Sequence, residues 1–306
     1  MEIIEDNLNT KLKYETYIAL GSFDGVHLGH INLIKKTVEL SLFNKCKSMV
    51  FTFKNHPLTI IKPEYAPKLL MTNDVKVSIL ESIGIDLVNL VEFNNEFMRY
   101  SPTEFITKLV YFYNVKGIIV GFNYKFGYKN SGNIKLLERL SKKLKFELHI
   151  VEPVMFNNEI ISSTRIRTLI SEGNIKTANK MLIKPYFLEG LVIKGKQIGR
   201  TIGFPTINFY LESMILFPKI GAYLTTAQIK GKIYKGITNI GINPTFNGER
   251  LSIETYIIDF NEDIYGEKVK LFFVKWMRDE IKFDSKEELI AQLELDKVYA
   301  IKEKIL

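Results

Sequence analysis

Short β-rich runs alternate with helical patterns through the first half of the chain, and this alternation constrains the fold more than any other feature. The runs YIALGSF, SMVFTF, LVNLVEF, GIIVG and FELHIVE are separated by segments with helical spacing, up to about residue 152. Strands that alternate with helices are joined by crossover connections, which make the strands parallel. The pattern predicts a Rossmann-like α/β domain, with a parallel sheet covered by helices on both faces.

The pattern changes after about residue 184. The runs GAYLTTAQI, KIYKGITNIG, LSIETYIIDF and KVKLFFVKWM are separated by Gly, Asn and Pro, with few helical signals between them. They predict an antiparallel, Greek-key-type β-barrel. A capping box at Ser285 and Glu288 then predicts a C-terminal helix. We therefore expect two domains, 1–184 and 185–306.

Composition narrows the possible partners and the compartment. The chain has 306 residues, 46% of them hydrophobic, which suffices for two packed cores. The single cysteine, Cys46, forms no internal disulfide and fits a reducing cytoplasm. We see no signal peptide and no run of membrane-spanning length, so we expect a cytoplasmic protein with no membrane partner.

The formal net charge of +8 suits nucleic acid, an anionic membrane surface or small phosphorylated ligands. The lysines are spread along the chain without a basic block or an RNA-binding aromatic signature, so nucleic-acid binding is disfavoured. For the oligomeric state, a monomer and weak self-association both stay open.

The segment GSFDGVHLGH, which begins at Gly21, joins a predicted strand to a predicted helix. Free N–H groups and the helix dipole favour anions at such a point. His27 and His30 are three residues apart, which puts both imidazoles on one face, and Gly29 between them lets a nucleotide approach the backbone. We expect both histidines to contact phosphate; incidental histidines at a packed helix end, or half of a metal site, are the alternatives.

Two further segments have the composition of phosphate sites. In ISSTRIR, Ser163 and Thr164 precede a helix that carries Arg167, although a plain helix cap with a solvated arginine would look the same. In KGKQIGRTIGFPTINF, from Lys194, glycines allow backbone to approach phosphate, and the Thr and Asn that follow offer neutral oxygens suited to Mg²⁺. A turn-rich hairpin is the alternative there.

These motifs together resemble one family. GSFDGVHLGH resembles the opening motif of the nucleotidyltransferase superfamily, in the form typical of bacterial bifunctional riboflavin kinase/FMN adenylyltransferases. ISSTRIR resembles that family's second ATP loop, and the run from Gly199 to Asn208 resembles its riboflavin kinase signature. NIGINPTF and IETYIIDF follow in the family's order, so the resemblance spans about Tyr17 to Asp296.

The resemblance implies two ATP-dependent steps. The C-terminal barrel would phosphorylate riboflavin to FMN, and the N-terminal nucleotidyltransferase domain would adenylylate FMN to FAD and release pyrophosphate, both with Mg²⁺. It implies these roles: catalytic His27, His30 and Glu254; ATP-binding Gly21, Phe23, Asp24, Gly29, Ser163, Thr164 and Arg167, and in the barrel Gly195, Gly199, Arg200, Thr206 and Asn208; metal-binding Thr206 and Asn208; flavin-binding Asn123, Phe126 and Arg278.

The middle segment VGFNYKFGYKNSGN departs from the family pattern. Asn123 stands where an Asp is common, and Asn130 and Asn133 replace charged residues. His56, in FTFKNHP, is expected to be structural or to line the substrate rather than to be catalytic. The departures leave two alternatives: a riboflavin kinase with a weak or inactive adenylyltransferase domain, and a non-catalytic regulator that binds flavin or RNA.

Overall fold

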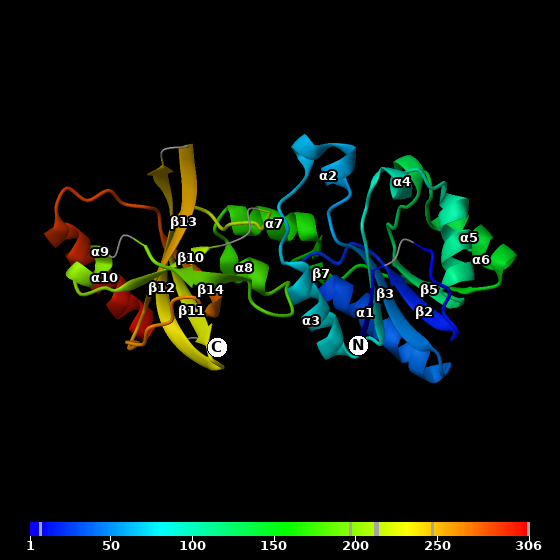
Figure 1. Ribbon diagram of the computed structural model, residues 1–306, viewed down its shortest axis with the longest axis horizontal. Coiled ribbons are helices and arrows are strands. Elements are labelled where there is room, and N and C mark those ends of the chain that lie inside the picture. The colour runs from blue at the N-terminus through cyan, green and yellow to red at the C-terminus, as the bar shows by residue number, and fades with distance from the viewer. Residues whose placement is uncertain (6–7, 196–197, 211–213, 246–247, 305–306) are drawn as a thin grey trace. The chain divides into compact units, whose positions relative to one another are not determined.

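The computed structural model describes residues 1–306 except 6–7, 196–197, 211–213, 246–247 and 305–306, and it leaves the side chains of 198, 243–245 and 248–250 undescribed (Figure 1). The chain separates into two compact units, Met1–Ser163 and Thr164–Leu306. Each unit has its own sheet, so each is described by itself.

The first unit contains a six-stranded sheet in the order β1-β4-β3-β2-β5-β6, in which every neighbouring pair is parallel. The predicted parallel sheet is therefore confirmed. Its strands are β1 (Glu2–Ile4), β2 (Thr16–Leu20), β3 (Lys47–Phe53), β4 (Leu87–Val91), β5 (Val115–Gly121) and β6 (Glu147–Val151). Sequence reasoning missed β1, because three residues show no periodicity.

Helices cover both faces of this sheet, as predicted (Figure 1). On one face, α5 (Pro102–Phe112) and α6 (Ile134–Leu144) bury Phe105, Leu109 and Leu137 against the strands. On the other face lie α1 (Leu28–Phe43) and α3 (Asn73–Ile83), with buried Ile34 and Ile79. Burying apolar residues on both faces explains why the strands read as continuous apolar runs rather than as alternating ones.

Short elements complete the first unit. They are α2 (Leu58–Ile61), η1 (Pro63–Tyr65), α4 (Asn95–Met98), η2 (Tyr128–Asn130) and the hairpin of β7 (Met155–Phe156) with β8 (Glu159–Ile160). All except the β7–β8 hairpin lie in loops that follow β3, β4 or β5. These loops leave the sheet at its carboxyl edge, where ligands bind in open α/β folds.

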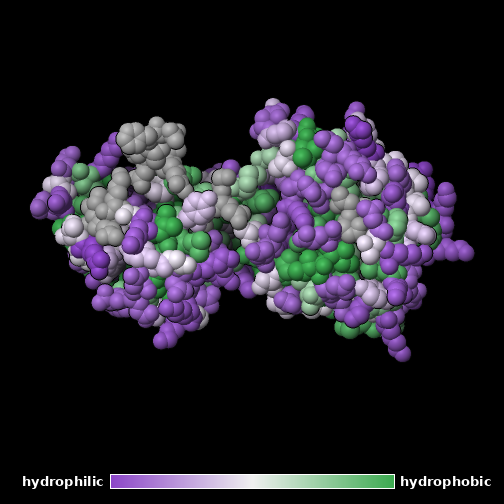
Figure 2. Space-filling view, in the orientation of Figure 1, coloured by the Kyte–Doolittle hydropathy of each residue, from purple (hydrophilic) through white to green (hydrophobic). Residues whose placement is uncertain are grey.

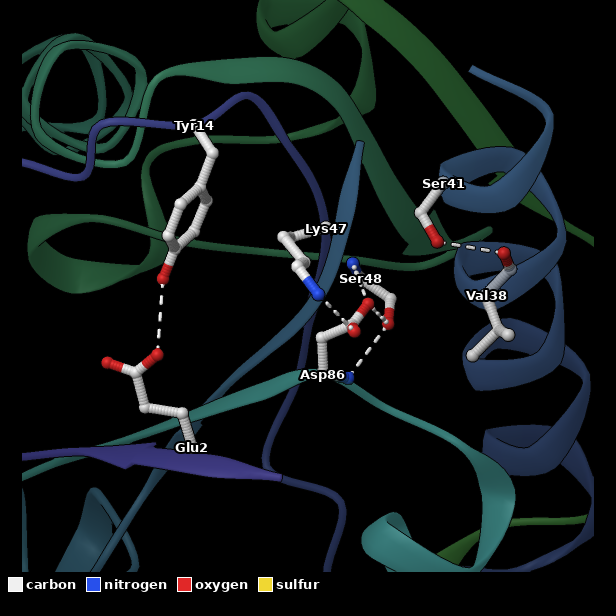
Figure 3. Close-up of polar contacts among 7 residues, drawn as sticks. All are labelled: Glu2, Tyr14, Val38, Ser41, Lys47, Ser48 and Asp86. Atoms are coloured by element: carbon white, nitrogen blue, oxygen red, sulfur yellow. Dashed lines mark hydrogen bonds and ion pairs between the residues drawn. The ribbon is translucent and has the colours of Figure 1, made fainter. Parts of the chain in front are cut away.

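A polar cluster joins the amino ends of β3 and β4 (Figure 3). The Asp86 carboxylate accepts hydrogen bonds of 2.9 Å from the Ser48 amide, the Ser48 hydroxyl and the Lys47 ammonium. Nearby, the Tyr14 hydroxyl donates to Glu2 of β1 at 3.3 Å. Side chains of the chain itself occupy this amino edge, so its polar residues fix the strands in place.

The second unit is built on a closed six-stranded barrel in the order β10-β13-β12-β11-β14-β9, and all its pairs are antiparallel. The predicted antiparallel barrel is confirmed. The strands are β9 (Phe187–Ile193), β10 (Thr206–Tyr210), β11 (Gly221–Ile229), β12 (Lys232–Thr245), β13 (Gly248–Ile257) and β14 (Lys268–Arg278). Three buried threonines, Thr225, Thr238 and Thr255, hydrogen-bond in a chain at 2.8 Å, so these buried hydroxyls satisfy one another.

The helices that follow or flank the barrel strands are α7 (Ser163–Ser171), α8 (Ile175–Asn179), α9 (Ile198–Thr201) and α10 (Lys286–Lys302), of which α8 packs on β14 and α10 on β12. In α8, the side-chain Nδ2 of Asn179 donates to the Phe273 carbonyl of β14 at 2.9 Å. Residues 164–184 thus pack with the barrel in this structure, and the division of function at 184/185 stays a prediction. The predicted capping box of α10 is present in part: Ser285 accepts from the Glu288 amide at 3.2 Å, while the Glu288 carboxylate accepts from the Asp284 amide.

The visible surface of each unit is mostly hydrophilic, and its polar residues are spread rather than gathered (Figure 2). This fits a sequence with 42 basic and 34 acidic residues dispersed along it. In the part of the chain that the structure describes, no helix is both long enough and apolar enough to cross a membrane.

Candidate active sites

The first candidate site lies at the carboxyl edge of the parallel sheet, where β2 runs into α1. From β2 the chain crosses to β3 on one side, while β5 adjoins β2 on the other, so the strand order reverses here. Ligands of open α/β sheets bind in the crevice at such a reversal. The loop 21–27 therefore occupies the position that its sequence predicted.

His27 and His30 come together at the start of α1. His27 is the N-cap residue of the helix, and its Nδ1 accepts a hydrogen bond from the His30 amide at 3.3 Å. The two imidazoles are stacked, with ring centroids 3.6 Å apart and an interplanar angle of 18°. A Cβ on Gly29 would come within 3.1 Å of the His27 ring, so glycine allows the two rings to pack this closely.

Burial keeps both imidazoles neutral at pH 7. Desolvation lowers the pKa of His27 to about 4. It lowers the pKa of His30 well below its usual value, and repulsion from His27 and Lys76 adds to the effect. Because a neutral His27 accepts at Nδ1, its proton is on Nε2, which is then a donor. The buried Nδ1 of His30 has no hydrogen-bond partner among the described residues, so a polar ligand atom would satisfy it.

The loop before the histidines is held in an uncommon backbone conformation. Phe23 and Val26 are both fully buried and have φ values of 49° and 33°, and Gly25 has a φ of 82°. Positive φ is rare for a β-branched residue and costs about 1–3 kcal/mol, a strain found most often at functional sites. The Phe23 ring meets His30 edge-on at 5.2 Å, so the loop conformation also fixes the second histidine.

Asp24 anchors this loop to its neighbours. Its carboxylate is 3% exposed and accepts from the Leu70 amide at 3.0 and 3.1 Å. The Asp24 carbonyl accepts from the Ser163 hydroxyl at 2.8 Å. The structure thus brings Ser163 to the loop. Gly21 also packs closely, because a Cβ there would come within 3.0 Å of the Phe23 ring.

The remaining residues predicted for this site lie in two other places. Thr164 and Arg167 belong to α7 in the second unit, so their predicted contact with ATP stays a prediction. Asn123 is exposed just beyond the end of β5. Phe126 is 5% exposed in the core, where its ring stacks on Tyr124 at 5.5 Å, so its buried ring faces protein.

Two further residues singled out in the sequence, Asn133 and His56, have side chains with local structural partners. Asn133 caps α6 by accepting from the Leu136 amide at 3.1 Å, which accounts for an asparagine at that position. His56 Nδ1 accepts from the Leu58 amide at 3.2 Å, as expected of a structural residue. Asn130 is exposed at the end of η2.

The second candidate site lies on strands β10 and β13 of the barrel. Asn208 is directly opposite Glu254, and Glu254 is directly opposite Asn239 of β12. Residues directly opposite in an antiparallel pair point to the same face, with Cβ atoms about 5 Å apart. Thr206, two residues before Asn208, shares that face. The four side chains are half-buried, whereas the alternate residues Ile253 and Thr255 are buried.

Glycines bring a loop onto this polar row. A Cβ on Gly195 would lie 2.2 Å from the Asn208 Nδ2, so the backbone there packs directly on the carboxamide. A Cβ on Gly199 would lie 2.2 Å from the Phe204 carbonyl and 3.5 Å from the Thr206 hydroxyl. Arg200 is exposed in the same loop, within α9. Sequence reasoning assigned no role to Asn239, which only the strand register places beside Glu254.

Hydroxyl, carboxamide and carboxylate oxygens are the donors that Mg²⁺ prefers. Thr206 and Asn208 supply a hydroxyl and a carboxamide on one face, and the Glu254 carboxylate lies beside them on the same face, so the residues present fit this ion.

Arg278 forms an ion pair with a buried carboxylate. Its guanidinium donates to Asp296 of α10, with Nη2 at 2.7 Å and Nε at 3.2 Å from the same oxygen. Asp296 is 4% exposed and also accepts from Gln292 at 2.9 Å. The pair joins β14 to α10, so Arg278 has a structural partner in addition to its predicted contact with flavin.

Comparison with known proteins matches both units. Residues 9–165 match the family model described as FAD synthetase, and residues 182–303 match the one described as riboflavin kinase. The bifunctional riboflavin kinase/FMN adenylyltransferases of Listeria monocytogenes and Bacillus subtilis are 37% and 36% identical over 91% and 94% of this chain, and 89% and 92% of their own.

A solved structure described as a macrolide-efflux protein from Streptococcus pneumoniae is 32% identical, with a TM-score of 0.91 over 99% of both chains. The two described units therefore share their folds with that protein. The two family matches and the curated relatives agree with the order of the two candidate sites. The chain belongs to the family of bifunctional riboflavin kinase/FMN adenylyltransferases.

Proposed function

We propose that the chain makes FAD from riboflavin in two ATP-dependent steps, one in each unit. The barrel phosphorylates riboflavin to FMN, and the parallel-sheet unit transfers AMP from ATP to FMN and releases pyrophosphate. The observation that carries the proposal is the pair of stacked imidazoles at the start of α1, with His27 buried and His30 half-buried with a buried Nδ1, beside a strained loop at the strand-order reversal. Packing alone gives no reason to keep a buried, unpartnered imidazole nitrogen there.

In adenylyl transfer, an FMN phosphate oxygen attacks the α-phosphorus of ATP, and the bond from that phosphorus to the pyrophosphate oxygen breaks. Negative charge grows on the leaving pyrophosphate. The Nε2–H of His27, an N–H of His30 and the free amides at the start of α1 donate to those oxygens. The histidines work by position and charge stabilisation, with no covalent bond to the nucleotide. Arg167 and Ser163 bind the same ATP.

In riboflavin phosphorylation, Glu254 orients the ribityl 5′-hydroxyl and takes its proton as the oxygen attacks the γ-phosphorus, and the bond from that phosphorus to the bridging oxygen breaks, so that ADP leaves. Thr206 and Asn208 would hold Mg²⁺, which neutralises phosphate charge when bound. Gly195, Gly199 and Arg200 bind the phosphates of ATP, with the glycine backbones as close contacts. Asn123, Phe126 and Arg278 are the proposed flavin-binding residues.

The proposal includes a cytoplasmic location, which the single cysteine supports because disulfides are rare in that reducing compartment. We further propose that the protein acts as a monomer or a weakly self-associating species. Two complete sets of candidate catalytic groups in one chain support this, because each reaction would then need no residue from a second copy.

Product analysis tests both halves at once. The protein is incubated with ATP and Mg²⁺ and with either riboflavin or FMN, under air and under reducing conditions. FMN from riboflavin and FAD from FMN are expected. FMN without FAD in every tube would replace the proposal with a kinase whose adenylyltransferase unit is inactive, the alternative that Asn123 motivates. If neither FMN nor FAD forms in any tube, the result would favour the alternative of a non-catalytic binding protein.

A further inference from the structure

Lys76 is a buried cation close to the proposed adenylyltransferase site. It is 5% exposed, and its ammonium donates to the Phe53 carbonyl, at the carboxyl end of β3, at 3.1 Å. Burying a lysine costs several kcal/mol unless its charge is compensated. No part of the reaction described above uses it.

The position of Lys76 in its helix makes the charge costlier still. It lies at the start of the second turn of α3. Side chains of a helix tilt toward its amino end. The ammonium of Lys76 therefore lies close to the positive end of the helix dipole. That end of α3 is fixed to the sheet edge, because Thr72 caps the helix and the Asn73 side-chain Nδ2 donates to the Lys54 carbonyl at 2.9 Å. The ammonium is therefore held at the carboxyl edge.

Charged and titratable groups on two neighbouring segments face this ammonium. The Asp24 carboxylate, in the loop before α1, attracts it. On α1, His30 is repelled by it when protonated, and His27 is stacked on His30. Burial lowers the pKa of Lys76 to about 8, and Asp24 opposes that shift, so the group is mostly charged at pH 7.

We infer that Lys76 is a positioning residue for adenylyl transfer: its buried ammonium is hydrogen-bonded to the end of β3, where the Thr52 hydroxyl also donates at 2.8 Å to Ser22 of the loop that carries Asp24 and the two histidines. The inference rests on the proposed function. Since the ammonium is buried and already donates to Phe53, it acts through that loop and does not touch ATP. Its charge also adds to the burial that lowers the pKa of His30.

Three variants test this in the full-length protein: Lys76→Met removes the charge, Lys76→Arg keeps it at every pH, and Lys35→Met, at an exposed lysine of α1, is the matched control. For Lys76→Met we expect kcat for FAD formation to fall roughly 10- to 100-fold with little change in the KM for ATP. FMN formation should stay within about twofold as the internal control. Lys35→Met should match the wild type in both reactions.

The pH profile separates a charge effect from a merely structural one. In the wild type, FAD formation should fall as the pH rises through about 8, because Lys76 loses its proton there. In Lys76→Arg this alkaline decline should be absent. NMR titration of the four histidines should show His30 accepting a proton at higher pH in Lys76→Met than in the wild type.

Any result that differs from these expected outcomes overturns the inference. A normal kcat in Lys76→Met would remove Lys76 from the reaction, and a raised KM for ATP alone would make it an ATP ligand. An alkaline decline that persists in Lys76→Arg, or an unchanged His30 titration, would remove the charge effect. If Lys76→Met does not fold, Lys76→Arg and the wild-type profile decide. If the wild type makes no FAD, the proposed function fails. The His30 titration then still tests whether the charge of Lys76 lowers the pKa of His30.

Discussion

Gly195→Ala should disable the kinase without unfolding the barrel. The new Cβ would lie 2.2 Å from Nδ2, 2.5 Å from Cγ and 2.8 Å from Oδ1 of Asn208, where ordinary contacts begin at 3.4 Å. The carboxamide must therefore retreat by about 1 Å. Metal ligands tolerate errors of only about 0.2 Å, and a misplacement of about 1 Å costs roughly 100-fold in rate, or about 2.7 kcal/mol.

The same substitution should hardly change stability. Turning Asn208 off its rotamer costs about 0.5–1.5 kcal/mol, and alanine in place of glycine recovers about 0.4–1 kcal/mol by restricting the unfolded chain. We therefore expect a melting temperature close to that of the wild type and normal FAD formation from FMN. FMN formation, followed by chromatography of the flavins, should fall roughly 100-fold.

An Asn208→Ala variant serves as the comparison, because both changes remove the same carboxamide from its place. The double variant should be no slower than Asn208→Ala alone. A Gly195→Ala enzyme that phosphorylates riboflavin within about threefold of the wild-type rate would refute the reasoning, since Asn208 would then tolerate the displacement.

Three other outcomes are expected. Glu254→Gln should abolish FMN formation and leave the conversion of FMN to FAD near normal; loss of both would argue against separate sites. His30→Ala should do the reverse, and an unimpaired rate of FAD synthesis would remove the histidine pair from the mechanism. Because the folded-state pKa of His27 is lowered to about 4, the unfolded chain binds the extra proton first, so the first unit should lose roughly 3 kcal/mol as the pH falls from about 6.5 to 4. Thermal unfolding at pH 7 and pH 4 measures this, and equal stability would contradict the burial of His27.

Much of the fold was predictable because its signals are local. Apolar runs between helical segments predicted the parallel sheet, and Gly, Asn and Pro between β-rich runs predicted the barrel. The strand β1 was missed because its stability comes from pairing with β4, which no local pattern of three residues reveals. The packing of α8 on β14 was missed for the same reason, since it depends on a contact between residues 94 positions apart.

The site was predictable only where residue type and spacing carry the chemistry. The proximity of His27 and His30 followed from their spacing at a helix start, and the structure confirms it. Lys76 was missed, although it falls three and four residues before buried Ile79 and Leu80, on the apolar stripe of α3. The Asp24–Leu70 and Arg278–Asp296 contacts join segments far apart in the sequence, so no spacing rule finds them.

Closure of the barrel determines which strands of the described chain could pair with another protein. Every strand of the second unit has a partner on both sides, so that unit offers no edge to a foreign strand. In the six-stranded sheet of the first unit the edges are β1 and β6, which are three and five residues long and carry Glu2 and Glu147. Short, charged edges resist templated aggregation. In the described chain, the strand edges that the larger folded sheets leave open therefore lie in the first unit, where their shortness and charge limit pairing with other chains.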